Sequence, residues 1–237
     1  MPFDQTMRIA AKLISVLLLL AYCEAIEAQV YSNNSDTVYG FDPLLYNGRI
    51  YSWVSPRNTN GDPYFTGKDF ITGGVRVRGK SYDSLQLNYD IFNQQLLLKY
   101  INMEGATMIL EISKSWLETF RLDRLDFEFI PDGESRIYQV IKSDSVKILY
   151  YWKKDLKLDS FHGNSSFTFS RPIRTCTVMV NGVTGSYRNN REFVKAFPES
   201  YRKQLGNYMR MKRINVRKAP DILMKELVQF GNSLLTK

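Results

Sequence analysis

Few side chains in this chain are of the kinds that perform catalysis. His162 is the one histidine, and it lies in a polar sequence, Phe161-His162-Gly163-Asn164-Ser165. A single histidine excludes zinc sites built on several histidines, and it makes a Ser-His-Asp triad depend on one residue. No Gly-x-Ser-x-Gly nucleophile sequence occurs. We therefore predict no catalytic residue, no metal site and no cofactor, and we interpret His162 as an exposed loop residue.

Carboxylates offer the second chemical possibility. Asp123, Asp126 and Glu128 lie close together in the sequence and could supply the pair that hydrolyses a glycosidic bond. Asp126 and Glu128 also alternate with Leu125 and Phe127, which is the pattern of solvent-facing residues on a strand. A non-catalytic protein is the primary hypothesis, and a carboxylate-based hydrolase acting on glycans is the alternative.

Basic charge gathers at the end of the chain. The formal net charge is +8, and residues 188–237 hold 12 Lys and Arg against 4 Asp and Glu. Such a face can bind an anionic surface, although it can also serve only to keep a protein soluble. The candidate residues for an anionic surface are Arg210, Lys212, Arg213, Arg217 and Lys218. A lipid or an anionic envelope component is the predicted partner, and we expect no nucleic acid.

The first 28 residues have the pattern of a secretory signal peptide. Arg8 and Lys12 precede the apolar run Leu13 to Ala21, and Ala28 offers a small residue before a cut. Cleavage would leave residues 29–48 as an N-terminal leader, whether Met1 or Met7 is the true start. Cys23 raises lipidation as a weaker alternative. The chain is thus predicted to be exported, to the periplasm or the outer membrane.

Residues 49–188 are predicted to form an antiparallel β body. Its centre is the stretch from Gly73 to Tyr100, in which apolar and polar residues alternate over three short strands. Further strands are expected over residues 49–54, 107–112, 117–122, 125–130, 136–142, 146–152 and 166–170. Val180-Asn181-Gly182-Val183 is the type I′ hairpin pattern. This hairpin places Cys176 on the apolar face, where we expect a buried, unreactive thiol.

Residues 189–237 change to a helical period. Asn190 is predicted to cap residues 191–197, and Ser200 a helix that continues to Arg213. A last helix is expected with Pro220 as its first residue and with Leu223, Leu227, Phe230 and Leu234 facing the sheet. The predicted fold is α+β and mostly β: a long curved antiparallel meander, an open barrel or roll, closed by two or three C-terminal helices.

Two stretches resemble a family of exported proteins. Gly73 to Ile91 fits the pattern G-x-V-x-x-x-G-x-x-Y-x-x-x-x-L-x-Y-D-I, and residues 187–208 read YRNNREFVKAFPESYRKQLGNY. Both are similar to uncharacterised exported proteins of Bacteroidota-type Gram-negative bacteria, in which Tyr89, Asp90, Phe197 and Pro198 match structural positions. The resemblance implies the fold and an envelope location, and no activity. The hypothesis is an exported, non-catalytic envelope protein that binds or scaffolds and could hold an apolar or lipid ligand.

Overall fold

The protein is represented by a computed structural model that describes residues 41–131, 135–161 and 164–236. The chain divides into two compact units, Met1–Asp42 and Pro43–Lys237. The predicted signal peptide, Cys23 and His162 lie outside the described residues. The second unit contains all the strands and helices described below. It also takes in the last residues of the predicted leader, where Leu45 is buried.

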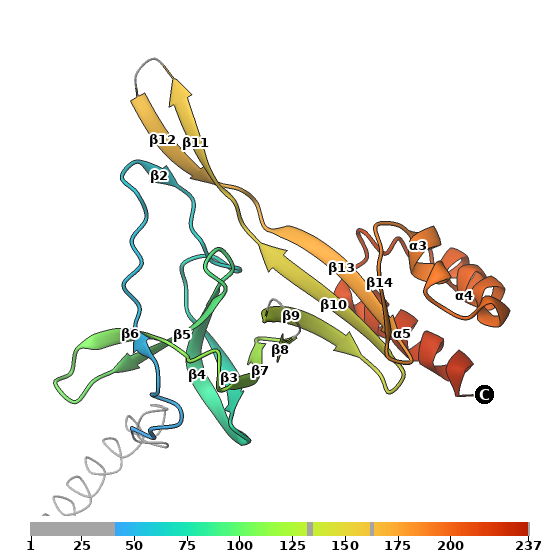
Figure 1. The fold of residues 1–237 in the computed structure, drawn as a ribbon, viewed down its shortest axis with the longest axis horizontal. Helices are drawn as coiled ribbons and strands as arrows, with labels where there is room; N and C mark the ends of the chain where they lie inside the picture. Colours follow the sequence, from blue (N-terminus) through green and yellow to red (C-terminus); the bar gives the residue numbers. More distant parts are fainter. Residues whose placement is uncertain (1–40, 132–134, 162–163, 237) are drawn as a thin grey trace, which may run out of the picture. The chain divides into compact units, whose positions relative to one another are not determined.

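One open antiparallel sheet of eleven strands dominates the described structure (Figure 1), which confirms the predicted fold class. The strand order is β1-β6-β5-β4-β3-β7-β8-β9-β10-β13-β14, so the sheet has two edges and does not close into a barrel. The strands are β1 (Arg49–Ile50), β3 (Ile71–Val77), β4 (Lys80–Asp90), β5 (Gln95–Ile101), β6 (Thr107–Glu111), β7 (Leu117–Leu122), β8 (Leu125–Ile130), β9 (Arg136–Lys142), β10 (Val146–Lys153), β13 (Ile173–Val180) and β14 (Val183–Ser186).

Two-residue turns set the register of the best-predicted hairpins. Asn181 and Gly182 have φ of 48° and 82°, the left-handed conformation of a type I′ turn, and Val180 pairs with Val183 as expected. The β3–β4 turn is formed by Arg78 and Gly79, also with positive φ. Lys80 and Ser81 follow this turn directly and already belong to β4.

One pairing joins the two halves of the sheet. β3, the first strand of the Gly73–Tyr100 meander, pairs on its other side with β7, so that Gly73 lies opposite Leu122. A Cβ on Gly73 would lie 2.2 Å from the carbonyl oxygen of Arg121, which is closer than any real contact. Glycine at this position therefore permits the close approach of β3 and β7.

A second sheet, formed by three strands, branches between β10 and β13. β11 (Leu156–Phe161) and β12 (Asn164–Phe169) form a hairpin, and β2 (Thr59–Asn60) pairs in parallel with β12. β11 was not predicted. The strand expected over residues 49–54 is only two residues long, because after the Tyr51 amide bonds to the carbonyl of Ile109 the chain leaves the sheet.

Three helices follow the sheet: α3 (Asn190–Lys195), α4 (Glu199–Met211) and α5 (Asp221–Leu235). Their caps differ from the predicted ones. Asn189, not Asn190, caps α3 by accepting a hydrogen bond from the Glu192 amide. Pro198 and Pro220 stand at the N-cap positions of α4 and α5, because each has an extended ψ that precedes the helix.

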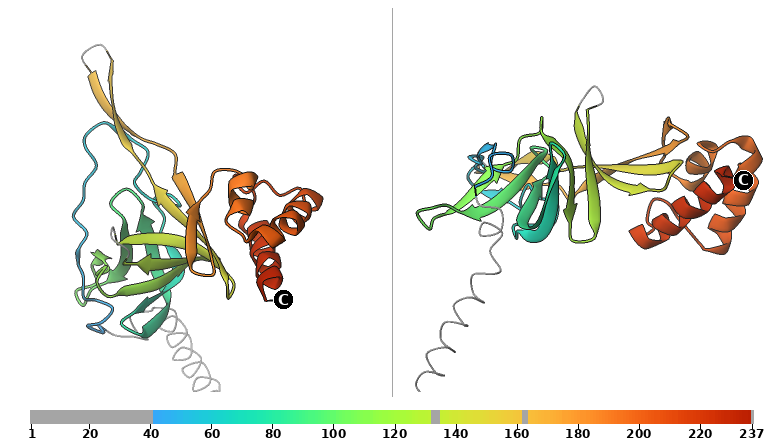
Figure 2. Two further views of the ribbon diagram at one scale, coloured as in Figure 1. Left: turned by 45° about the vertical axis from the view of Figure 1, so that its right-hand side comes forward. Right: turned by 90° about the horizontal axis from the view of Figure 1, so that it is seen from below.

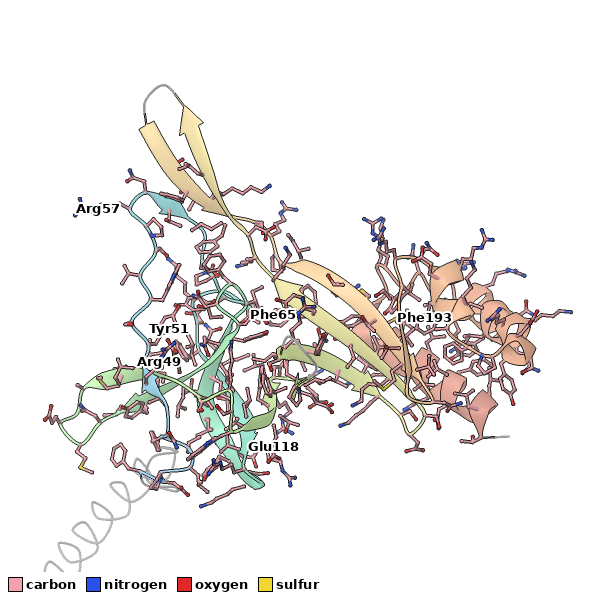
Figure 3. The ribbon with its side chains drawn as sticks, viewed as in Figure 1. Arg49, Tyr51, Arg57, Phe65, Glu118 and Phe193 are labelled. Atoms are coloured by element: carbon pink, nitrogen blue, oxygen red, sulfur yellow. The ribbon has the colours of Figure 1, made fainter. Side chains whose placement is uncertain are left out.

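The helices pack on the β9, β10, β13 and β14 end of the sheet, as both views in Figure 2 show. Phe193 lies at the centre of this core (Figure 3) and is fully buried. The buried face of α5 is formed by Met224, Leu227, Val228, Gly231 and Leu234. Leu223 and Phe230 of the predicted stripe are only half-buried, and the Phe230 ring stacks on Tyr208. Each fully buried side chain of this size contributes about 1.5–3 kcal/mol.

Candidate functional site

A basic groove runs between α3 and α4. Its volume is about 750 Å³, and no acidic residue lines it. Its floor is apolar and includes Val194, Met209 and Ile214. Its basic residues, which together with this floor define the groove, are Arg191, Lys195, Arg202, Arg210 and Arg213. An apolar floor with a basic rim is suited to a ligand that has both an acyl chain and a negative charge.

Asn190 fixes the loop that closes one end of the groove. Its amide nitrogen donates to the carbonyl of Ile214 at 2.7 Å, and its amide oxygen accepts from the Val216 amide at 2.9 Å. Both bonds cross from α3 to the segment after α4. One side chain thus holds Arg213 and Arg217, which flank these two positions, near the start of α3.

Arg202 ties α4 to the end of α3. Its Nε donates to the carbonyl of Phe197 at 2.9 Å and its Nη2 donates to the carbonyl of Lys195 at 3.1 Å. The Lys195 carbonyl is one that the end of α3 leaves without an intrahelical partner, and the Phe197 carbonyl lies just beyond that end. Arg202 therefore contributes positive charge to the groove and also positions the two helices that form it.

Arg213 ends α4 in a left-handed conformation, with φ of 53°. Its amide donates to the carbonyl of Arg210, and the Ile214 amide donates to the carbonyl of Met209. This is the Schellman arrangement, and Met209 and Ile214 supply its apolar contact. Glycine is the usual residue at this position, so an arginine here retains a strained backbone.

None of the five groove cations forms an ion pair in the described structure, and Arg202 bonds only to backbone carbonyls. Arg191, Lys195, Arg210 and Arg213 are exposed, and none forms an ion pair there. Like charges held together without partners repel one another, and this repulsion is relieved when an anion binds. The groove is therefore electrostatically prepared for an anionic ligand.

The five residues predicted for an anionic surface do not lie at one site. All are exposed, but only Arg210 and Arg213 line the groove. Lys212 is paired with Glu226 at 3.3 Å, Arg217 lines a second pocket, and Lys218 lines neither of these two sites.

Three groove residues were not predicted from the sequence: Arg191, Lys195 and Arg202. Helical spacing could have found them, because Arg191 and Lys195 are four residues apart on α3. Arg202 and Arg210 are eight residues apart on α4, about two helical turns, and Arg213 directly follows the C-cap of that helix.

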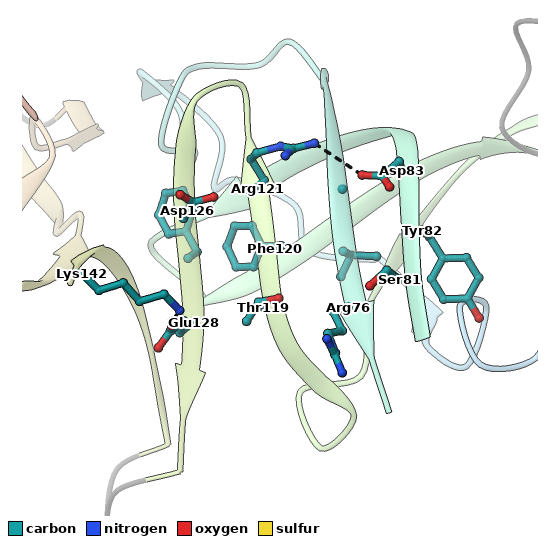
Figure 4. A pocket seen from close by; sticks show the side chains of 13 residues that line it. Arg76, Ser81, Tyr82, Asp83, Thr119, Phe120, Arg121, Asp126, Glu128 and Lys142 are labelled. Atoms are coloured by element: carbon teal, nitrogen blue, oxygen red, sulfur yellow. Dashed lines mark hydrogen bonds and ion pairs between the residues drawn. The ribbon is translucent and has the colours of Figure 1, made fainter. Parts of the chain in front are cut away.

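The carboxylates proposed for a hydrolase lie on the polar face of the main sheet. Asp126 lines a pocket of about 430 Å³ there with Asp83 and Glu128, whereas Asp123 lies in the β7–β8 turn and does not line it (Figure 4). Arg121 pairs with Asp83 at 3.4 Å and is also the cross-strand neighbour of Asp126.

Glu128 is held by two lysines. Burial would raise the pKa of its carboxyl group, but hydrogen bonds and charge from Lys142 and Lys147 outweigh burial and lower it. A glycosidase acid needs a raised pKa, so Glu128 is suited to an ion pair and not to proton donation.

Cys176 is half-buried, so the prediction of a buried thiol is wrong in degree. Its backbone continues the predicted register, because the Tyr187 amide donates to its carbonyl at 3.0 Å. Burial raises the pKa of the thiol, which keeps it protonated at neutral pH. One side of this residue packs on the helical core and the other lines a pocket.

The described residues contain no group of three or more His, Cys, Asp and Glu side chains that could hold a metal ion. In the same ranges, no helix combines the length and the hydropathy needed to cross a membrane. Comparisons with protein-family models, curated proteins and solved structures found no match to this chain.

Proposed function

We propose that this chain is an exported, non-catalytic envelope protein that binds anionic lipid through the basic groove of its C-terminal helices. One observation carries the proposal: the groove combines an apolar floor with five basic residues and no acidic one. Lipid of negative charge matches both properties, since its acyl chain can cover the floor while its headgroup meets the rim. The signal-peptide pattern and the resemblance of Gly73–Ile91 support export.

Vesicle flotation tests the proposal. The full-length protein should float with vesicles containing anionic phospholipid at low salt and remain unbound with zwitterionic vesicles. Binding should weaken strongly between about 10 mM and about 150 mM salt, because the screening length falls from about 30 Å to about 8 Å.

A matched pair of variants separates the groove from net charge. Arg191→Glu with Arg210→Glu reverses two groove charges that make no ion pair in the described structure, and it should abolish flotation. Lys203→Glu with Lys225→Glu changes the net charge equally at two exposed helix positions outside the groove. This control should bind as the wild type does. Equal loss in both variants would leave only a non-specific charge effect and contradict the proposal.

A further inference from the structure

A second pocket lies where β13 and β14 separate. It has a volume of about 430 Å³, within the usual range of small-molecule sites. Three arginines from different segments line it: Arg174 on β13, Arg188 after β14 and Arg217 before α5. Cys176 and Tyr187 also line it, and no acidic residue does. We call it the arginine pocket.

Arg174 is held rigidly on the wall of this pocket. Its guanidinium carbon lies 4.3 Å from the centre of the Tyr150 ring and 5.5 Å from that of Trp152. Its Nη2 donates to the backbone carbonyl of Arg217 at 2.9 Å. The guanidinium also interacts with the Cys176 thiol, and these contacts use fewer than its five N–H groups, which leaves others for a ligand.

The remaining polar groups also favour an anion. Two carboxylates lie four residues from a pocket arginine, and neither lines the pocket. Glu192 accepts hydrogen bonds from the Arg188 amide and the Asn189 side chain, and Asp221 accepts one from the Gln139 side chain at 2.6 Å. The hydroxyls of Tyr150 and Tyr187 are buried and interact with each other, and burial raises the pKa of both, so neither carries a negative charge at neutral pH. The Cys176 thiol carries no negative charge at neutral pH because burial raises its pKa. Nothing along the lining therefore neutralises the three guanidinium groups.

We propose that the arginine pocket binds a phosphate group, either as the free ion or as the phosphomonoester of a small soluble molecule. Three guanidinium groups more than balance the charge of about −2 on a phosphomonoester, and planar guanidinium pairs with phosphate oxygens through two parallel hydrogen bonds. The volume exceeds that of the bare ion, which leaves room for an attached organic group. This site uses none of the basic-groove residues and does not rest on the lipid-binding proposal.

The test uses the full-length chain carrying Cys23→Ser, so that Cys176 is its only thiol. Inorganic phosphate, glycerol 3-phosphate and anionic phospholipid vesicles are titrated separately, and binding of the soluble probes is measured by calorimetry. One of the two soluble phosphates should bind. It should also slow the alkylation of Cys176 by a maleimide under native conditions, because the thiol shares the pocket.

Two double variants locate the binding. Arg188→Gln with Arg217→Gln should weaken soluble phosphate at least about tenfold, since it removes two charge-assisted contacts. Arg191→Gln with Arg210→Gln removes equal charge from the groove and should leave soluble phosphate unchanged. Each single pocket variant is measured too. Arg217→Gln leaves the backbone bond to Arg174 in place, so a fold defect in the double variant does not block the test.

Three results would overturn the proposal. The wild type could bind neither soluble phosphate, the two double variants could weaken binding equally, or only vesicle binding could depend on Arg188 and Arg217. The last result would assign these arginines to the lipid surface instead.

Discussion

Arg213 occupies a backbone conformation that glycine adopts more readily. A non-glycine residue in the left-handed region costs about 1–3 kcal/mol, and Arg213 also lines the basic groove. We therefore expect Arg213 to lower the stability of the fold and to strengthen the binding of an anionic ligand.

We expect Arg213→Gly to stabilise the fold by about 1 kcal/mol and to weaken binding to anionic vesicles. Urea unfolding and vesicle flotation measure the two effects on one preparation. Arg213→Lys is the control, because it keeps the charge and should keep the strain. A destabilised Arg213→Gly variant would show that the arginine side chain makes a stabilising contact that outweighs its backbone strain.

Tyr150 makes the stability of the fold depend on pH in the alkaline range. Burial raises the pKa of its hydroxyl from about 10 to about 12, so the folded chain holds this proton more tightly than the unfolded chain. The resulting stability is complete below about pH 10 and is lost as the pH rises to about 12. The loss can reach about 1.4 kcal/mol per pH unit for one group.

Tyr150→Phe should therefore lose stability less steeply than the wild type above about pH 10. At neutral pH the variant should be nearly as stable as the wild type, because the buried hydroxyl it removes interacts only with the Tyr187 hydroxyl and makes no hydrogen bond of good geometry in the described structure. Urea unfolding at a series of pH values checks both statements. Parallel curves for the two proteins would mean that Tyr150 does not contribute to the alkaline transition.

At the scale of elements, α5 packs against the loop between α3 and α4 through a glycine. A Cβ on Gly231 would lie 2.9 Å from the buried Phe197 ring. A Cβ on Gly206 of α4, in contrast, would meet no atom of the described structure within 4 Å. A substitution at Gly206 therefore tests helix propensity alone, whereas a substitution at Gly231 also tests the packing of the helices.

Gly206→Ala should stabilise the protein by about 1 kcal/mol, because alanine is the better helix former. Gly231→Ala gains the same propensity, but it must displace Phe197 and should lose about 1–3 kcal/mol in net terms. Thermal and urea unfolding of both variants provide the comparison. Equal stabilisation by the two substitutions would contradict the tight helix packing.

Local sequence patterns predicted which strands and turns form better than they predicted features that depend on tertiary contacts. The alternation in β3, β4 and β5 and the Asn181-Gly182 turn depend on residues close in sequence, and these predictions are confirmed. The caps of α3 and α4 were misplaced by one or two residues, because Asn189, Asn190 and Ser200 are all acceptable cap residues by type. Only tertiary contacts select among them, such as the bonds from Asn190 to Ile214 and Val216.

At the scale of the whole molecule, the basic charge of the last 50 residues was evident from composition. The division of that charge between the basic groove and the arginine pocket was not. The groove needs α3 beside α4, and the arginine pocket needs Arg174 from β13 beside Arg217. Residues 43 positions apart meet there only because the helices fold back on the sheet. No periodicity in the sequence encodes such a meeting, so the second site could not have been predicted.

The β3–β7 pairing can be tested through Gly73. Gly73→Ala places a methyl group against the Arg121 carbonyl, so the two strands must separate. We expect a loss of several kcal/mol and a reduced yield of folded protein. Thr72→Ala is the control on the same strand, since Thr72 is exposed. Near-equal unfolding midpoints for the two variants would show that the strands can shift without cost.

The β3–β7 pairing can form only after β7 has been translated. Translation completes β3, β4, β5 and β6 before β7 leaves the ribosome, so the growing chain carries β3 with one row of unpaired amides and carbonyls. Such an edge is a template for association with another chain. A nascent chain stalled before Leu117 should therefore recruit chaperones or self-associate more than one stalled after Ile130, once each has cleared the exit tunnel. The slower the ribosome is to release β7, the longer the unpaired edge of β3 can associate with another chain.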